Sequence, residues 1–123
     1  MTSPFAAGSL SNAEDAVVVP ERNGTARVPI AMIDWIEAAK DYVLLHTPSR
    51  SYMVRMTMSE LERRLDPQVM VRVHRSAFVR RDTIAERRQS RRGAGSVVLT
   101  DGSELPIGPS YMRLVDRVMH EGG

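Results

Sequence analysis

The chain has 123 residues, 42% of them hydrophobic, which allows one domain with a modest core. It has no cysteine and no apolar run near the roughly 18 residues of a membrane span, which excludes disulfides, thiolate metal sites and a transmembrane helix. The formal net charge is only +2, yet residues 72–92 hold eight arginines against two acidic residues, a local balance of +6.

Residues 1–24 are rich in Ser, Ala, Gly, Asn and Pro and show no sustained hydrophobic period, which predicts a flexible tail or linker. The short VVV at 17–19 is compatible with an edge strand inside this tail. The N-terminus lacks the basic and apolar segments of a signal peptide, so we expect a cytoplasmic protein. Residues 25–121 are then expected to form the folded domain.

A series of short runs rich in β-branched and aromatic residues predicts strands that pair through short connections. The sequences AAKD and TPSRS separate the last three runs, and TPSRS is a good hairpin loop. The runs are RVPI (27–30), IDWIEA (33–38), YVLLHT (42–47) and SYMVRM (51–56).

The segment TMSELERRLDP (57–67) changes to a helical period. Thr57 and Glu60 form a capping box, which satisfies free amide donors at the start of a helix. Apolar residues recur on one face from Met58 to Leu65, and the proline that follows ends the helix.

The period returns to about two in VRVHRSAFVRR (71–81), which predicts a strand with one buried and one solvated face. A further strand is expected to start at Thr83 and Ile84. On an ideal strand His74 and Arg75 point to opposite faces, so both can reach one ligand only if the strand ends or bends there.

The segment GSVVLTDGSELPI (95–107) predicts a hairpin, because its Asp-Gly pair suits a tight turn between two short apolar runs. Pro106 cannot donate a hydrogen bond to a ladder, which predicts that the last strand lies at a sheet edge. PSYMRLVDRVMHEGG (109–123) predicts a second helix, capped by Ser110. The chain is therefore expected to be mainly β, with small packed antiparallel β-sheets and two short helices.

The sequence offers no pattern for a catalytic or metal site. His46, His74 and His120 have no metal-ligand spacing, and no phosphate-binding glycine motif occurs. A nucleophile would have to pair Ser76 with His74 on a strand, without an oxyanion hole or a strained elbow nearby. We therefore expect a binding protein without enzymatic activity, cofactor or metal.

The charge distribution instead indicates a polyanionic partner. Four arginines between residues 87 and 92 repel one another, and a surface that concentrates positive charge in this way commonly meets a polyanion. A solvated hairpin tip is the plainer interpretation of the same residues. The arginine fork suits phosphate and guanine, and six aromatic residues are few for RNA recognition by stacking, so DNA is favoured over RNA.

Several segments in a fixed order carry a family resemblance. IDWIEAAKDYVLLHT is followed by SYMVRMTMSELERRLDP and VRVHRSAFVRRDTI, ahead of a DG hairpin and ELPIGPSYM. This order resembles the LytTR DNA-binding domain, the output domain of LytR/AlgR-type bacterial response regulators. The resemblance implies a transcriptional regulator whose loops read two successive major grooves of double-stranded DNA and the minor groove between them. It also implies binding to paired direct repeats as a homodimer.

Carried over by position, the resemblance assigns three contact segments: the turn at residues 40–42, the RVHRS segment, and residues 108–113. The chain departs from the family pattern where RR at 80–81 replaces a frequent asparagine, and where GPSYM replaces a serine followed by basic residues. The second departure weakens the case for base reading by that segment. The expected DNA contacts are Lys40, Tyr42, Arg72, His74, Arg75, Ser76, Arg80, Arg81, Arg87, Arg88, Arg91, Arg92, Ser110, Tyr111 and Arg113.

Within this set Arg75 is expected to read bases, because its fork can bridge O6 and N7 of guanine or enter a narrow minor groove. His74 either contacts DNA or is a hydrogen-bonded pin under the loop, and Tyr42 either contacts DNA or is partly buried in the core. Arg72 is expected to contact a phosphate or form an ion pair, and the other arginines to contact phosphates.

An alternative from another class is a protein-interaction module that has lost base reading and recruits a partner through its tail. The roughly 24 residues ahead of the domain are too few for a receiver domain or a membrane sensor. The chain is therefore expected to be a stand-alone regulator, controlled by abundance or by a partner protein, or a fragment of a larger one.

Overall fold

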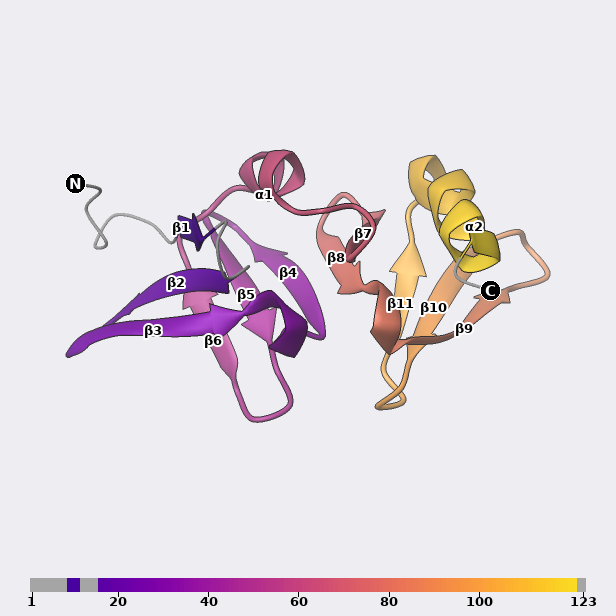
Figure 1. Ribbon diagram of the computed structural model, residues 1–123. Coiled ribbons are helices and arrows are strands. Elements are labelled where there is room, and N and C mark those ends of the chain that lie inside the picture. Colours follow the sequence, from indigo (N-terminus) through magenta and orange to yellow (C-terminus); the bar gives the residue numbers. More distant parts are fainter. Residues whose placement is uncertain (1–8, 12–15, 122–123) are drawn as a thin grey trace. The chain divides into compact units, whose positions relative to one another are not determined.

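A computed structural model of the chain describes residues 9–11 and 16–121, and these residues form two compact units. The first unit lies within residues 1–64 and the second within residues 65–123. Both are built mainly of short antiparallel strands, and each contains one short α-helix (Figure 1). The predicted class, mainly β with small antiparallel sheets and two short helices, is confirmed.

A three-stranded sheet opens the first unit, and the run VVV lies in its middle strand rather than at an edge. Val17 and Val19 of this strand are buried. Burial of these valines offsets the polar composition around them, so residues 16–24, predicted to belong to a flexible tail, form most of a hairpin instead. The rest of that tail, residues 1–8 and 12–15, lies outside the described residues, and the domain boundary stays a prediction. In order across the sheet, the strands are β1 (Ser9–Ser11), β2 (Ala16–Glu21) and β3 (Gly24–Pro29).

The other strands of the first unit confirm the predicted runs IDWIEA, YVLLHT and SYMVRM. The loop between the last two is closed by Thr47, whose hydroxyl and amide donate to the carbonyl of Arg50 at 2.6 and 3.0 Å. Val43 and Leu45 point into the core, while the Trp35 ring stacks on His46 with the ring centroids 4.3 Å apart. After the 3₁₀ helix η1 (Ile30–Met32) come β4 (Trp35–Ala39), β5 (Tyr42–His46) and β6 (Ser51–Val54), with β5 in the middle.

Helix α1 (Met58–Arg64) begins as predicted. The hydroxyl of Thr57 accepts a hydrogen bond from the amide of Glu60 at 3.0 Å, which satisfies one of the free donors of the first turn. Leu61 buries the apolar face of this helix, and the Glu60 carboxylate lies 3.7 Å from the Arg64 guanidinium.

The second unit begins with a hairpin where one strand was predicted. VRVHRSAFVRR turns at residues 75 and 76, because the two-residue turn lets the apolar residues of both arms face the core. Thr83 also differs from the prediction: it lies in a 3₁₀ helix, where its hydroxyl donates to the carbonyl of Arg80 at 2.7 Å. The elements are β7 (Met70–His74), β8 (Ala77–Arg80) and η2 (Arg81–Thr83).

A three-stranded sheet and helix α2 complete this unit. The strand that contains Pro106 lies at the sheet edge, as predicted. Ser110 does not cap α2, because the chain enters this helix through a 3₁₀ turn in which Ser110 is the middle residue. Val115 and Val118 form the buried stripe of α2. The elements are β9 (Ile84–Gln89), β10 (Gly95–Leu99), β11 (Glu104–Ile107), η3 (Pro109–Tyr111) and α2 (Met112–Glu121), with β10 central in its sheet.

Candidate nucleic-acid interface

The β7–β8 turn brings His74 and Arg75 to the end of one hairpin. His74 pairs with Ala77, so Arg75 and Ser76 are the two turn residues. The ladder shifts register between Arg72 and His74, which is the irregularity of a β-bulge. Strand β7 therefore ends at His74. Such an end is what allows both His74 and Arg75 to reach one ligand.

The His74 ring is fixed at one nitrogen and open at the other. Its Nδ1 accepts a hydrogen bond from the backbone amide of Ser76 at 3.2 Å and lies 2.8 Å from the Ser76 hydroxyl oxygen. Because an amide can only donate, a neutral ring carries its proton on Nε2. Nε2 has no hydrogen-bond partner in the described part of the chain. His74 is thus a pin under the turn, and it still holds a free donor for a ligand.

The Arg75 side chain is exposed at the tip of this turn. Among residues 9–11 and 16–121, no side chain or carbonyl accepts a hydrogen bond from its guanidinium, and no carboxylate pairs with it. Its planar fork of donors is therefore available to a partner outside the chain.

Arg72 lies half-buried in β7, and its guanidinium binds carbonyl groups of the same unit. Nε donates to the carbonyl of His74 at 3.3 Å, and Nη2 donates to the carbonyl of Arg75 at 2.7 Å. The guanidinium carbon lies 5.4 Å from the ring centroid of Phe78 and 5.5 Å from that of Tyr111. The phosphate contact or ion pair expected for Arg72 stays a prediction.

The segment between β11 and α2, the third predicted contact region, lies against the β7–β8 hairpin. The amide of Gly108 donates to the carbonyl of Val73 at 2.8 Å. A Cβ atom on Gly108 would lie 3.2 Å from Cδ2 of Tyr111 and 3.4 Å from Cδ2 of His74. The structure therefore brings the second and third predicted contact segments together. Ser110 and Arg113 are exposed on this segment, and Tyr111 is half-buried.

The first predicted contact segment is a tight turn in the first unit. Ala39 pairs with Tyr42, so Lys40 and Asp41 are the two turn residues. Lys40 has a φ of 60°, a conformation that few non-glycine residues adopt, and its side chain is exposed. Tyr42 is 41% exposed and lies at the surface. DNA contact by these residues stays a prediction.

Arg80 and Arg81 are half-buried. Arg81 donates to the Gln68 side chain and to the Val118 carbonyl, both at 3.3 Å, so it binds close to the C-terminal end of α2. Carbonyl groups at a helix C-terminus attract cations, which gives Arg81 a structural use. Its predicted contact with DNA, like that of Arg80, remains untested.

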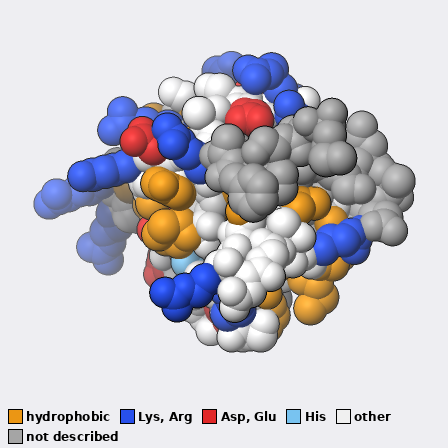
Figure 2. Space-filling view, turned by 90° about the vertical axis from the view of Figure 1, so that its left-hand side faces the viewer, with side chains coloured by type: hydrophobic (Ala, Val, Ile, Leu, Met, Phe, Trp, Pro, Cys, Tyr) orange, Lys and Arg blue, Asp and Glu red, His pale blue; other side chains and the backbone are white. Residues whose placement is uncertain are grey.

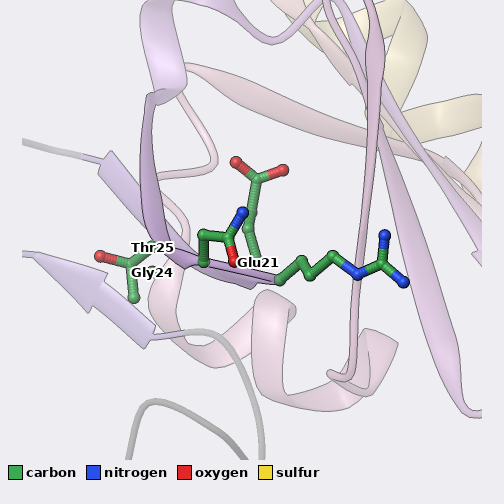
Figure 3. Close-up of a pocket in the computed structure, with 5 residues that line it drawn as sticks. Glu21, Gly24 and Thr25 are labelled. Atoms are coloured by element: carbon green, nitrogen blue, oxygen red, sulfur yellow. The ribbon is translucent and has the colours of Figure 1, made fainter.

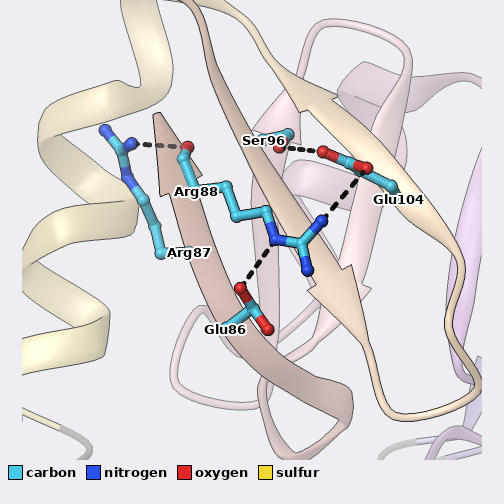
Figure 4. A network of polar contacts seen from close by, with 5 residues as sticks. All are labelled: Glu86, Arg87, Arg88, Ser96 and Glu104. Carbon is cyan, nitrogen blue, oxygen red and sulfur yellow. Dashed lines mark hydrogen bonds and ion pairs between the residues drawn. The ribbon is translucent and has the colours of Figure 1, made fainter. Parts of the chain in front are cut away.

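The fold divides the arginine cluster of residues 87–92 into two pairs. Figure 4 shows the first pair, with Arg88 between Glu86 and Glu104. Arg87, with a side chain only 13% exposed, places Nε 2.9 Å from Oδ1 of Asp116 on α2. Arg88 places Nε 2.7 Å from Glu86 and Nη1 3.8 Å from Glu104. The hydrogen bond and the charge of Glu86 raise the pKa of Arg88 above its ordinary value, and Glu104 adds a smaller contribution.

Arg91 and Arg92 lie in the exposed loop between β9 and β10. Within the described ranges their guanidinium groups have no carboxylate partner and no hydrogen bond. Of the four clustered arginines, this pair alone lies at the hairpin tip, because Arg87 and Arg88 lie inside β9. Two of the four clustered arginines are neutralised, and the positive charge on this hairpin is smaller than the sequence suggests.

The acidic partners of this cluster were not identified from the sequence. Arg88 lies opposite Ser96, and Glu86 lies opposite Val98, which in turn pairs with Glu104. A sequence-based register for β9, β10 and β11 would have placed both glutamates beside Arg88. Asp116 carries no comparable local signal, because its distance from Arg87 depends on how α2 packs.

The hollow at the β2–β3 turn is lined by residues 21–25 (Figure 3), and its Glu21 carboxylate pairs with Arg50 at 3.0 Å. In the view of Figure 2, hydrophobic side chains gather in separate groups with basic side chains beside them. No three His, Asp or Glu side chains of the described ranges are placed to hold a metal ion. Over the same ranges, no helix is long and apolar enough to cross a membrane.

Residues 23–120 match the model of the LytTr DNA-binding domain family. The solved LytTr DNA-binding domain from Bacillus cereus superposes with a TM-score of 0.75 at 18% sequence identity, covering 85% of this chain and 95% of that one. At this identity the superposition supports the fold alone.

Curated relatives include transcriptional regulators and a sensory transduction protein. The chain is 30% identical over 69 residues to the transcriptional regulatory protein LytR of Staphylococcus aureus, covering 56% of this chain and 28% of LytR. It is 28% identical over 79 residues to the sensory transduction protein LytT of Bacillus subtilis, covering 64% and 33%. It is 35% identical over 85 residues to the CO-responsive transcriptional regulator RcoM of Rhodospirillum rubrum, covering 68% and 36%. The matched region spans about a third of each relative.

Proposed function

The chain belongs to the family of LytTr DNA-binding domains, and we propose that it binds double-stranded DNA sequence-specifically as part of a bacterial transcriptional regulator. One observation carries the specific part of this proposal. The β7–β8 turn exposes the side chain of Arg75, and the adjacent His74 keeps an Nε2 donor that has no partner among the described residues. The family is one of DNA-binding domains, and catalysis has no part in the proposal.

Arg75 is the proposed base reader. The major-groove edge of guanine offers two acceptors, O6 and N7, and a planar guanidinium can bind both at once. His74 supplies a single donor at Nε2, which suits guanine N7, adenine N7 or a phosphate oxygen. Ser76 supports these contacts by fixing the His74 ring through Nδ1.

Phosphate binding is proposed for exposed basic side chains at turns. Arg91 and Arg92 on the β9–β10 loop, Arg113 at the start of α2, and Lys40 on the β4–β5 turn are all exposed. Such contacts give affinity without sequence preference, because each neutralises a phosphate and releases a counterion. Arg88 is a weaker candidate, since two glutamates already neutralise it.

We extend the proposal to the mode of binding that the family resemblance implies. The loops of one domain would enter two successive major grooves and touch the minor groove between them, and two copies would occupy paired direct repeats. Two of the segments assigned to these contacts are tight turns, one in each unit, and they expose Lys40 and Arg75. A protein that acts on bacterial DNA in this way works in the cytoplasm.

The regulatory input is also a matter of proposal. LytR, LytT and RcoM are about three times as long as the region they share with this chain, so they hold further segments. We propose that this domain supplies the DNA contact and that a separate domain or a partner protein supplies the signal.

Salt dependence of binding tests this function. Duplexes selected from random-sequence DNA would be titrated with the protein at several salt concentrations, with single-stranded RNA as competitor. About five phosphate contacts predict a log–log slope of roughly −4 to −5. Failure to select any duplex, or a flat salt response, would refute DNA binding and favour a protein-interaction module. Displacement of the duplex by RNA would point to RNA as the partner.

A further inference from the structure

The side chain of Arg72 contacts two of the proposed DNA-binding segments at once. Two of its nitrogens donate to backbone carbonyls, to that of His74 at 3.3 Å and to that of Arg75 at 2.7 Å. These carbonyls lie at the end of β7 and in the β7–β8 turn. Its guanidinium carbon also lies 5.5 Å from the ring centroid of Tyr111, which belongs to the β11–α2 segment. One guanidinium therefore bridges the turn that carries Arg75 and the segment that leads into α2.

The backbone joins the same two segments beside Arg72. The register shift in the β7–β8 ladder leaves Val73 without a paired residue on β8. Its carbonyl accepts the amide of Gly108 at 2.8 Å instead. Gly108 is buried, and atoms of the His74 and Tyr111 rings lie within 3.4 Å of the position that a Cβ would occupy. The turn and the β11–α2 segment thus share one packed junction.

Arginine has properties that this junction uses and lysine lacks. Its donors lie in a rigid plane, so one side chain can bind two carbonyls while its face lies over an aromatic ring. A lysine ammonium keeps the charge, but it cannot hold two acceptors in a fixed plane and stack on a ring. The geometry around Arg72 therefore depends on the shape of the guanidinium and not only on its charge.

We infer that Arg72 is a positioning residue that holds the β7–β8 turn and the β11–α2 segment in one arrangement, so that Arg75 meets DNA in a preformed position. This inference rests on the proposed function. A preformed position lowers the conformational entropy that Arg75 loses on binding, which raises the affinity for the preferred sequence. It does not change the number of phosphates that the protein contacts.

A charge-conserving substitution separates positioning from phosphate contact. For Arg72→Lys we expect affinity for the selected duplex to fall on the order of tenfold, because the two carbonyl hydrogen bonds and the stacking are lost. Affinity for poly(dI-dC) and the salt slope stay unchanged. Arg50→Lys is the matched control, because Arg50 also lies over a tyrosine ring but is not among the proposed DNA contacts, and it should leave both affinities unchanged. Full affinity for the selected duplex in Arg72→Lys, or a slope reduced by about 0.9 in Arg72→Ala, would instead assign Arg72 to a phosphate.

A double-mutant cycle tests whether Arg72 acts through Arg75. In an Arg75→Ala background, Arg72→Lys should weaken binding of the selected duplex at most about twofold, because the group being positioned is gone. An additive, tenfold loss in that background would overturn the inference. If Arg72→Lys does not fold, Tyr111→Leu replaces it in the cycle, since it removes the ring while keeping the arginine.

Amide hydrogen exchange of the DNA-free protein tests the junction itself. We expect the Gly108 amide to exchange faster in Arg72→Lys than in the wild type, while the amides of β10 are unaffected. Unchanged exchange at Gly108 would overturn the inference even if DNA binding is confirmed. If the wild type selects no duplex, the proposed function fails, and faster exchange at Gly108 would still show that Arg72 holds the junction.

Discussion

Two hairpins of the second unit are rich in arginine, and they use it in opposite ways. At β7–β8, Arg72 binds backbone carbonyls, and Arg75 is exposed without a carboxylate partner in the described part of the chain. At β9–β10, Arg87 and Arg88 pair with carboxylates. A carboxylate cancels the charge of its arginine, whereas a carbonyl orients the group and leaves its charge in place. The density of arginine in a sequence therefore does not measure the positive charge that a surface presents.

The largest expected difference between the two hairpins is the loss of stability when a nearby glycine, Gly108 or Gly95, is replaced by alanine. Gly108→Ala would place a Cβ 3.2 Å from the Tyr111 ring and 3.4 Å from the His74 ring, and both rings are held by packing. We expect a loss of about 1 kcal/mol in the free energy of unfolding, seen as a lower melting temperature. Gly95→Ala is the control: its Cβ would lie 3.1 Å from Nη1 at the far end of the Arg87 side chain, which needs to shift by only a few tenths of an ångström. An equal loss in the two variants would contradict the difference between the hairpins.

Salt dependence separates paired from unpaired arginines on the β9–β10 hairpin itself. Arg91→Ala and Arg92→Ala should each make the log–log slope shallower by about 0.9 and weaken all DNA sequences alike. Arg88→Ala should leave the slope unchanged, because its charge is already balanced by Glu86 and Glu104. Titrations with poly(dI-dC) measure all three variants. A slope change in Arg88→Ala would show that the ion pairs open when DNA binds.

The smallest expected effect concerns the β10–β11 turn, which is closed by a carboxylate without any arginine. The backbone amide of Ser103 donates to Asp101 at 2.8 Å, and this bond, with the Ser103 side chain, lowers the pKa of Asp101 below its ordinary value of 3.8. A carboxyl with a lowered pKa stabilises the fold above its unfolded pKa, and this contribution is lost as the pH falls through the folded pKa. Asp101→Asn keeps a hydrogen-bond acceptor at this position but removes the titrating group. As the pH is lowered from about 5 to about 2, the melting temperature of the variant should therefore fall slightly less than that of the wild type. Identical pH profiles would show that the turn does not depend on this charge.

The fold was largely predictable because its signals are local. Alternating apolar residues marked β4, β5, β6, β10 and β11, Thr57 marked the start of α1, and Pro106 marked an edge strand. The β7–β8 turn was missed because His-Arg-Ser-Ala contains no glycine, proline, asparagine or aspartate, so period two continued across it. The hairpin at residues 16–24 was missed because its stability depends on burial of valines within a polar segment.

The candidate site was only partly predictable. RVHRS and GPSYM were both named from the sequence as contact segments, but their common junction depends on Val73 and Gly108, which are far apart in the chain. The ion pair of Arg87 likewise depends on Asp116, which lies in α2, and β10 and β11 separate this helix from β9 in the chain. Local patterns predict which residues are basic, and only the tertiary fold decides which of them remain available.

The affinity of Arg75→Ala for two DNA probes tests the central claim most directly. Fluorescence anisotropy would compare the wild type and the variant on the selected duplex and on poly(dI-dC). We expect the variant to lose about 1 to 3 kcal/mol on the selected duplex, with relaxed preference at one base pair, and to keep the affinity of the wild type for poly(dI-dC). Unchanged affinity and preference on the selected duplex would show that the β7–β8 turn does not read the sequence.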